Sequence, residues 1–119
     1  MACEILRIDG EIVHIRLKGI MKPTDLQSIQ NAGKKLIGQG IKPRLLVTLD
    51  DFQGWEKGGN WDDVGFMLTQ GKNITKMAIV GDERWKEDVF AFVAKGLRPT
   101  EIEFFALSAL NEAESWVQA

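Results

Sequence analysis

Three aspartates that follow predicted strands are the side chains best placed to do chemistry. Asp50 and Asp51 come directly after the apolar run Leu45–Leu49, and Asp82 comes shortly after the run Ile74–Val80. The carboxyl ends of parallel strands form the edge where open α/β sheets usually bind ligands, so paired carboxylates there could hold a divalent cation or act as acid and base. The structural alternative makes Asp50 and Asp51 turn residues and Asp82 the N-terminal cap of the following helix. We expect the structural roles.

The other candidate groups lack the partners that catalysis or metal binding needs. His14 is the only histidine, falls on the predicted polar face of its strand, and has no second histidine for a dyad or a metal pair. Cys3 is the only cysteine, which excludes an internal disulfide and a thiolate cluster and leaves a weak nucleophile without a base in view. The glycine-rich stretch 54–59 lacks the spacing and the lysine-serine ending of a phosphate-binding loop. The sequence therefore predicts no enzyme, no cofactor and no metal.

The elements that must position these groups alternate between strands and helices. Cys3–Asp9 and the alternating run Ile12–Lys18, joined at Asp9-Gly10, predict an antiparallel hairpin. Further strands are expected at 44–49, 74–80 and 100–105, with helices at about 23–37, 60–70, 83–95 and 109–117. This order predicts one α/β domain over residues 1–119. Its five-stranded, mostly parallel mixed sheet begins with an antiparallel strand pair and carries four helices.

Composition excludes several classes of function. The chain has 119 residues, of which 45% are hydrophobic and 27% charged, as in an ordinary globular domain. Its net charge is −2 and its basic residues are scattered among acids, so nucleic-acid binding is not expected. No apolar run is long enough to span a bilayer, and Glu4, Arg7 and Asp9 stand where a signal peptide needs an apolar centre. We expect a cytoplasmic protein, with contact at the inner face of the membrane as an option.

The segment Phe52–Leu68 carries more large apolar side chains than one connection in a small domain needs. Burying each contributes roughly 1.5–3 kcal/mol, so five of them together represent on the order of 10 kcal/mol, comparable to the net stability of a domain. On the predicted helix Asn60–Gln70, most of the apolar side chains lie together on one face, and Phe66 lies well away from them. The two interpretations are packing against the sheet and the loop, or contact with a ligand, a membrane or a second copy. Trp85 is either a core residue or the wall of a cavity beneath this helix.

The chain resembles SpoIIAA-like single-domain proteins of the STAS and lipid-transfer (CRAL-TRIO) fold group. The resemblance spans nearly the whole chain and rests on the element order and on the stretches Met77–Trp85, Phe104-Phe105 and Glu112–Trp116. In the anti-anti-sigma factors that name the fold, an Asp-Ser-Ser-Gly-like stretch after the third strand carries a regulatory phosphoserine. Here that stretch, 50–55, reads DDFQGW, and residues 50–68 contain no serine or threonine. The resemblance therefore does not imply a phosphoserine switch.

What the resemblance does imply is a helix after the third strand that can move outward and expose an apolar cavity. The first hypothesis is a non-enzymatic binding module in which this helix, Asn60–Gln70, opens for a hydrophobic small molecule or lipid and associates with the membrane surface. The predicted ligand- or membrane-binding residues are Phe52, Trp55, Trp61, Val64, Phe66, Met67, Leu68 and Trp85.

The alternative hypothesis is a STAS-type protein–protein interaction or regulatory module that acts through a partner or a homodimer. An enzyme using the strand-end aspartates is the least favoured hypothesis, because nothing nearby forms a base–nucleophile pair.

Overall fold

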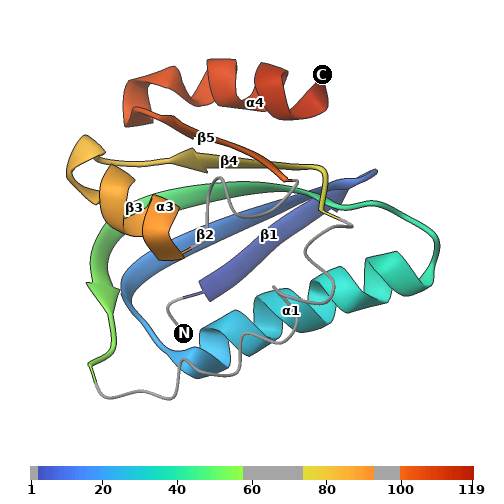
Figure 1. Cartoon of the computed structure of the whole chain (residues 1–119), viewed down its shortest axis with the longest axis horizontal. Coiled ribbons are helices and arrows are strands. Elements are labelled where there is room, and N and C mark those ends of the chain that lie inside the picture. The colour runs from blue at the N-terminus through green and yellow to red at the C-terminus, as the bar shows by residue number, and fades with distance from the viewer. Residues whose placement is uncertain (1–2, 58–73, 93–99) are drawn as a thin grey trace.

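The sheet of this protein has the predicted mixed, five-stranded form. The computed structural model describes residues 3–57, 74–92 and 100–119. Within these ranges the strands follow one another in the order β1-β2-β3-β4-β5 (Figure 1), with β1 antiparallel to β2 and the other neighbours parallel. The strands are β1 (Cys3–Asp9), β2 (Ile12–Met21), β3 (Arg44–Trp55), β4 (Lys76–Val80) and β5 (Glu101–Phe105). We call the edge where β2–β5 begin the amino edge and the edge where they end the carboxyl edge.

Helices cover both faces of the sheet. Helix α1 (Pro23–Gly38) lies on one face and α4 (Leu110–Gln118) on the other (Figure 1). Helix α3 (Lys86–Phe92) contributes to the same core as α1, and the 3₁₀ turns η2 (Glu83–Trp85) and η3 (Leu107–Ala109) precede α3 and α4. Three of the four predicted helices are thus described, and the one predicted at Asn60–Gln70 lies outside the described residues. None of the helices in the described ranges is long and apolar enough to cross a membrane.

The alternation of side chains along the strands builds two cores. Val13, Ile15 and Leu17 are buried on the α1 side, as the alternating pattern of β2 predicts. Strand β3 is apolar on both faces, as predicted for a central strand, because Leu46 belongs to the smaller core under α4. That core also contains Ala78, Val80, Ala113 and Val117. The sheet is therefore covered on both sides, which fits its parallel strands.

Strand β3 is longer than predicted. The sequence pattern ends it at Leu49 and begins a loop at Phe52, whereas the strand continues to Trp55. The pairing of β3 with β2 continues to the end of the strand because Asp51 (φ +53°) and Gly54 (φ +103°) adopt left-handed conformations. The register between the two strands also shifts on both sides of Gly19, as in a β-bulge. The prediction that Asp50 and Asp51 are turn residues is therefore wrong, since both belong to this bulged strand.

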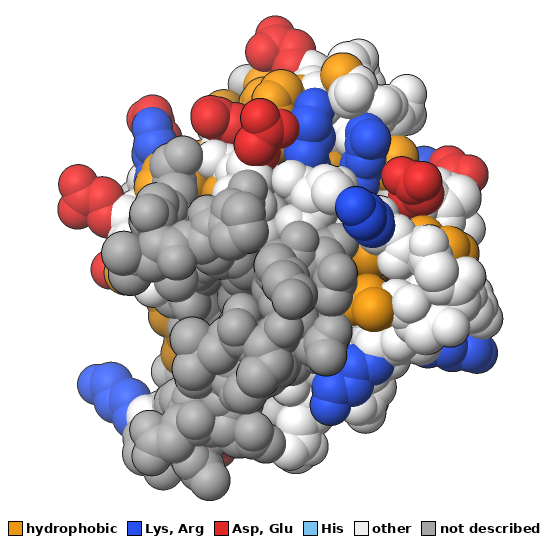
Figure 2. Space-filling view, turned by 45° about the vertical axis from the view of Figure 1, so that its right-hand side comes forward, with side chains coloured by type: hydrophobic (Ala, Val, Ile, Leu, Met, Phe, Trp, Pro, Cys, Tyr) orange, Lys and Arg blue, Asp and Glu red, His pale blue; other side chains and the backbone are white. Residues whose placement is uncertain are grey.

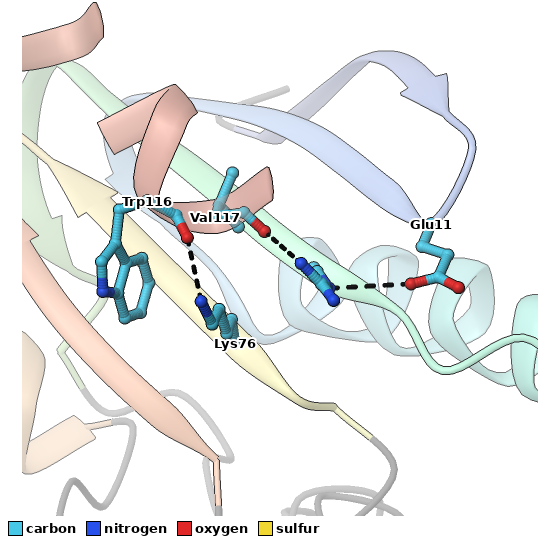
Figure 3. A network of polar contacts seen from close by, with 5 residues as sticks. Glu11, Lys76, Trp116 and Val117 are labelled. Atoms are coloured by element: carbon cyan, nitrogen blue, oxygen red, sulfur yellow. Dashed lines mark hydrogen bonds and ion pairs between the residues drawn. The ribbon is translucent and has the colours of Figure 1, made fainter. Parts of the chain in front are cut away.

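Two cations from the starts of β3 and β4 hold the last turn of α4 (Figure 3). Arg44 Nη1 donates to the Val117 carbonyl at 2.8 Å, and Lys76 Nζ donates to the Trp116 carbonyl at 3.0 Å. Lys76 Nζ also lies 4.9 Å from the centroid of the Trp116 ring, and Arg44 Nε lies 3.6 Å from a carboxylate oxygen of Glu11. The last carbonyls of a helix lack intrahelical donors and carry partial negative charge. These contacts therefore fix α4 at the amino edge.

The exposed apolar side chains are not spread evenly over the described surface. Among the described residues on the face shown in Figure 2, acidic and basic side chains are interspersed with small hydrophobic areas. The exposed large hydrophobic residues belong to β1 and β2 or to η3 and the start of α4: Ile5, Leu6, Ile8, Ile20, Leu107 and Leu110. An exposed apolar residue beside a cavity is a better candidate for binding than an isolated one.

Candidate functional site

A small cavity opens at the carboxyl edge of the sheet. Its volume is about 170 Å³. The end of β3, the turn after β4 and the turn after β5 all contribute to its lining, whose described residues are Leu49, Asp51, Phe52, Asp82, Arg84, Trp85 and Leu107. Segments far apart in the sequence meet here because the ends of parallel neighbouring strands share one edge. Asp51 and Asp82 both lie at this edge, where their places after the third and fourth strands put them.

Three aromatic rings pack together beside this cavity. The ring centroid of Phe52 lies 5.2 Å from that of Trp55 and 5.0 Å from that of Trp85, and the two tryptophan centroids are 6.1 Å apart. The interplanar angles of 86°, 70° and 81° make all three contacts edge-to-face, the arrangement that aromatic quadrupoles favour. Phe52 is only 3% exposed, whereas Trp55 and Trp85 are half-buried. We call these three residues the aromatic trio.

Gly54 allows the trio to close over the strand. Its φ of +103° is one that residues with a side chain rarely adopt, and a Cβ atom built there would lie 3.4 Å from Cη2 of Trp85. The indole ring of Trp85 therefore rests against the backbone of the β3 bulge. The bulge is thus what brings β3 and η2 together at the site.

The charged groups of the cavity make local contacts. The Asp82 carboxylate accepts a hydrogen bond from the backbone N–H of Arg84 at 3.0 Å, so its predicted capping role is confirmed. The Asp51 carboxylate accepts one from the Gln53 side-chain amide at 3.1 Å. The Arg84 guanidinium lies over the Trp85 ring, 5.2 Å from its centroid. Among the described residues, no group of three or more histidine, cysteine or acidic side chains is placed to hold a metal ion. The arrangement offers apolar walls and a charged rim, which suit binding.

Sequence reasoning found part of this site. Of the eight predicted residues, Phe52, Trp55 and Trp85 are brought together, while the other five lie outside the described residues: Trp61, Val64, Phe66, Met67 and Leu68. Leu107 and Arg84 were missed. The position of Leu107 just after β5 could have identified it. Ligands usually bind at the carboxyl ends of parallel strands, and this rule applies to the end of β5 as it does to Asp51 and Asp82.

His14 is buried, contrary to the prediction that it lies on a solvated face. It is 7% exposed, and its Nε2 has no hydrogen-bond partner among the described residues. Burial is the main cause that lowers its pKa, and Arg7 lowers it further, while Asp9 and Glu114 act in the opposite direction. The prediction was wrong because His14 lies beside Leu46 of β3, which belongs to the core under α4. A neutral, covered imidazole is a structural side chain.

Cys3 is equally unsuited to nucleophilic chemistry. It is buried in the larger core, and burial raises the pKa of its thiol to about 11, with a further contribution from Asp25. The thiolate, which is the reactive form, is therefore scarce near neutral pH. Asp25 has a structural role, because its carboxylate accepts hydrogen bonds from the backbone N–H groups of Lys22 at 2.8 Å and Cys3 at 3.3 Å.

Comparison with known proteins agrees with this architecture. The model of the SpoIIAA-like family matches residues 12–118. The chain belongs to the SpoIIAA-like family. The fold and family implied by the resemblance noted in the sequence are thereby confirmed.

Two solved structures share the fold of this SpoIIAA-like domain. The first is the crystal structure of an uncharacterized protein of the DUF3478 family with a SpoIIAA-like fold from Shewanella loihica PV-4. It has a TM-score of 0.70 and 24% sequence identity over 98% of this chain and 92% of that chain. The second is the anti-sigma factor antagonist SpoIIAA in its unphosphorylated form. It has a TM-score of 0.62 and 17% identity over 99% of both chains. No curated protein matches the sequence. At these identities the two structures show the fold alone.

Proposed function

We propose that this SpoIIAA-like domain is a non-enzymatic, STAS-type interaction module that binds a partner protein through its carboxyl edge. One observation carries the proposal: the aromatic trio stands beside a cavity whose wall includes Leu107, which is 55% exposed. Exposed apolar groups next to a preformed cavity with a charged rim are typical of interaction sites. The proposal restates the alternative hypothesis from the sequence with a defined surface.

The family and the described chemistry support this proposal over catalysis. One structure of the same fold is that of an anti-sigma factor antagonist, which makes a regulatory, partner-binding role a natural candidate. The strand-end carboxylates serve local contacts, Cys3 is a buried thiol, and His14 is a buried imidazole. The stretch Asp50–Trp55 has no hydroxyl side chain, so we do not propose a phosphoserine switch.

The exposed apolar residues of β1 are a weaker candidate surface. Ile5, Leu6 and Ile8 lie among three charged residues of β1, and the pairing of β1 with β2 shifts at Leu6. Charges and bulges on an edge strand are the usual devices that prevent pairing with other chains. This contrast supplies a matched control for the carboxyl edge, since Ile8 and Leu107 are similarly exposed, at 49% and 55%.

Copurification from the protein's own cells tests the proposal. We expect the wild-type protein and Ile8→Glu to recover the same partner, and Leu107→Glu to lose it. Both substitutions add one charge at an exposed position. A difference in partner recovery between them therefore reflects loss of the binding surface and not a change in solubility. Recovery of the same partner by all three proteins would contradict the proposed surface, and recovery of none by the wild type would contradict the proposed function.

A hydrophobic small molecule or lipid is the second candidate. Trp55 and Trp85 are both half-buried and lie side by side, so a ligand could still cover them. Tryptophan emission that shifts blue with vesicles, together with cosedimentation, would favour this candidate and a membrane-surface role. Such binding would be weak and reversible, because even one myristoyl chain anchors a protein only marginally. A mass measurement in solution would show whether a second copy is the partner.

A further inference from the structure

The carboxyl-edge cavity has the size of a side-chain socket. Small-molecule sites usually measure about 300–1,000 Å³, whereas this cavity measures about 170 Å³. That volume corresponds to about six water molecules, at roughly 30 Å³ each in the liquid. One partner side chain therefore fits the cavity better than an extended acyl chain or a nucleotide does.

Among its described residues, the cavity has apolar walls, and two of the three charged side chains in the lining are acidic. Leu49, Phe52, Trp85 and Leu107 provide hydrophobic surface, and Asp51 and Asp82 provide carboxylates. Two further exposed acids, Asp50 and Glu83, are the chain neighbours of these aspartates. Among the lining residues that the structure describes, the one base is Arg84, and it already lies over the ring of Trp85. The complementary ligand has an apolar side chain in the cavity and positive charges beside it.

We infer that the carboxyl-edge cavity receives an apolar side chain of a partner protein, flanked by lysine or arginine residues that face Asp51 and Asp82. This inference rests on the proposed function and specifies the chemistry of the partner. The apolar anchor supplies most of the affinity, because exposed ion pairs are individually weak. The acidic rim supplies selectivity and raises the association rate at low salt.

Asparagine substitutions remove the two rim charges without removing their structural contacts. Asparagine caps a helix about as well as aspartate, so Asp82→Asn keeps the hydrogen bond to the Arg84 N–H. Asparagine also tolerates a left-handed conformation, which suits the φ of +53° at Asp51. The matched control carries Asp9→Asn and Glu101→Gln, because both acids are exposed and lie at the amino edge. The two double variants change the net charge equally at opposite edges.

Three capped tripeptides are the probes: Lys-Leu-Lys, Lys-Ser-Lys and Glu-Leu-Glu. Binding is measured from the NMR shifts of the Trp85 indole N–H and the Leu107 amide. We expect Lys-Leu-Lys to bind at millimolar concentration, and Lys-Ser-Lys to bind about tenfold more weakly because the apolar anchor is gone. Glu-Leu-Glu should bind the wild type about threefold or more weakly than Lys-Leu-Lys does. Lys-Leu-Lys should likewise bind the Asp51→Asn/Asp82→Asn protein about threefold or more weakly than it binds the wild type. The control variant should bind Lys-Leu-Lys as the wild type does.

Three results would overturn the inference. They are the absence of saturable shifts at Trp85 and Leu107, equal affinity for the basic and acidic peptides, and an unchanged affinity for Lys-Leu-Lys in the Asp51→Asn/Asp82→Asn protein. None of them contradicts the interaction module itself, which stands or falls with the copurification of a partner by the wild type and by Leu107→Glu. A recovered partner whose contact segment is acidic would likewise overturn the inference and leave the proposed function intact.

Discussion

Replacing Gly81 by alanine should destabilise the protein and distort the candidate site. Gly81 is buried at the end of β4, and its N–H donates to the Phe105 carbonyl at 3.0 Å. A Cβ atom built on it would lie 2.7 Å from Cδ1, 2.9 Å from Cβ and 3.0 Å from Cγ of Leu49. Cβ atoms rarely lie this close to other atoms, and because Leu49 Cβ is fixed by the backbone of β3, a rotamer change cannot relieve every contact. Overpacking of this kind costs about 1–3 kcal/mol.

Chemical denaturation measures the free energy of unfolding that this prediction concerns. We expect Gly81→Ala to lose about 1–3 kcal/mol, with weaker peptide binding because Leu49 lines the cavity. Gly38→Ala is the control, since a Cβ atom there meets nothing within 4 Å, and alanine favours a helix over glycine by up to about 1 kcal/mol. Adding Leu49→Ala to Gly81→Ala should relieve the strain only in part, because the Cβ contact remains. A free energy of unfolding for Gly81→Ala within about 0.5 kcal/mol of the wild-type value would refute the reasoning, since ordinary surface substitutions have effects of that size.

Three further predictions concern titration and the docking of α4. The pKa of His14 in the folded protein lies below the ordinary value of 6.5, so the unfolded chain binds more protons and the free energy of unfolding should fall as pH drops through 6.5. Unfolding curves measured between neutral pH and pH 5 should show a smaller loss of stability for His14→Gln than for the wild type. An identical dependence of stability on pH in the two proteins would argue against a buried imidazole. The Cys3 thiol, whose pKa is raised to about 11, should react slowly with iodoacetamide at neutral pH and much faster after unfolding, whereas rapid alkylation of the native protein would contradict its burial. Lys76→Met removes a charged hydrogen bond to the Trp116 carbonyl and should lower stability by about 1 kcal/mol after allowance for solvent. Hydrogen exchange would detect this change as about fivefold lower protection of the α4 amides. Unchanged protection would show that Arg44 alone is sufficient to hold α4.

The regular parts of the fold follow from the sequence because periodicity and strand-ending turns are local signals. The hairpin at Asp9-Gly10, the buried face of β2 and the central character of β3 and β4 were all predicted from such signals. The bulged end of β3 was not, because Gly54 and two aspartates resemble a loop when the pairing strand is unknown. Only the partner strand, with Gly19 opposite Phe52, makes that stretch part of the sheet.

Tertiary contacts decided what the local pattern could not. His14 alternates with apolar residues as an outward-facing residue does, but whether that face is wet depends on where the terminal helix docks. The docking depends on Arg44 and Lys76, which are seventy-three and forty residues from their carbonyl partners, respectively. The candidate site shows the same dependence, because Trp85 and Leu107 reach Phe52 only through the common edge of the sheet. Residue type predicted the aromatic residues of the site, and strand order determined their neighbours.

Photo-crosslinking in living cells tests the central claim most directly. A photoreactive amino acid replaces Leu107 in one protein and Ile8 in another, two similarly exposed residues at opposite edges of the sheet. The interaction module predicts a discrete, heavier protein adduct from position 107 and none from position 8. An adduct of twice the mass of the chain would identify a second copy as the partner. A lipid-sized adduct at position 107, or equal protein adducts from both positions, would contradict a partner-protein surface at the carboxyl edge.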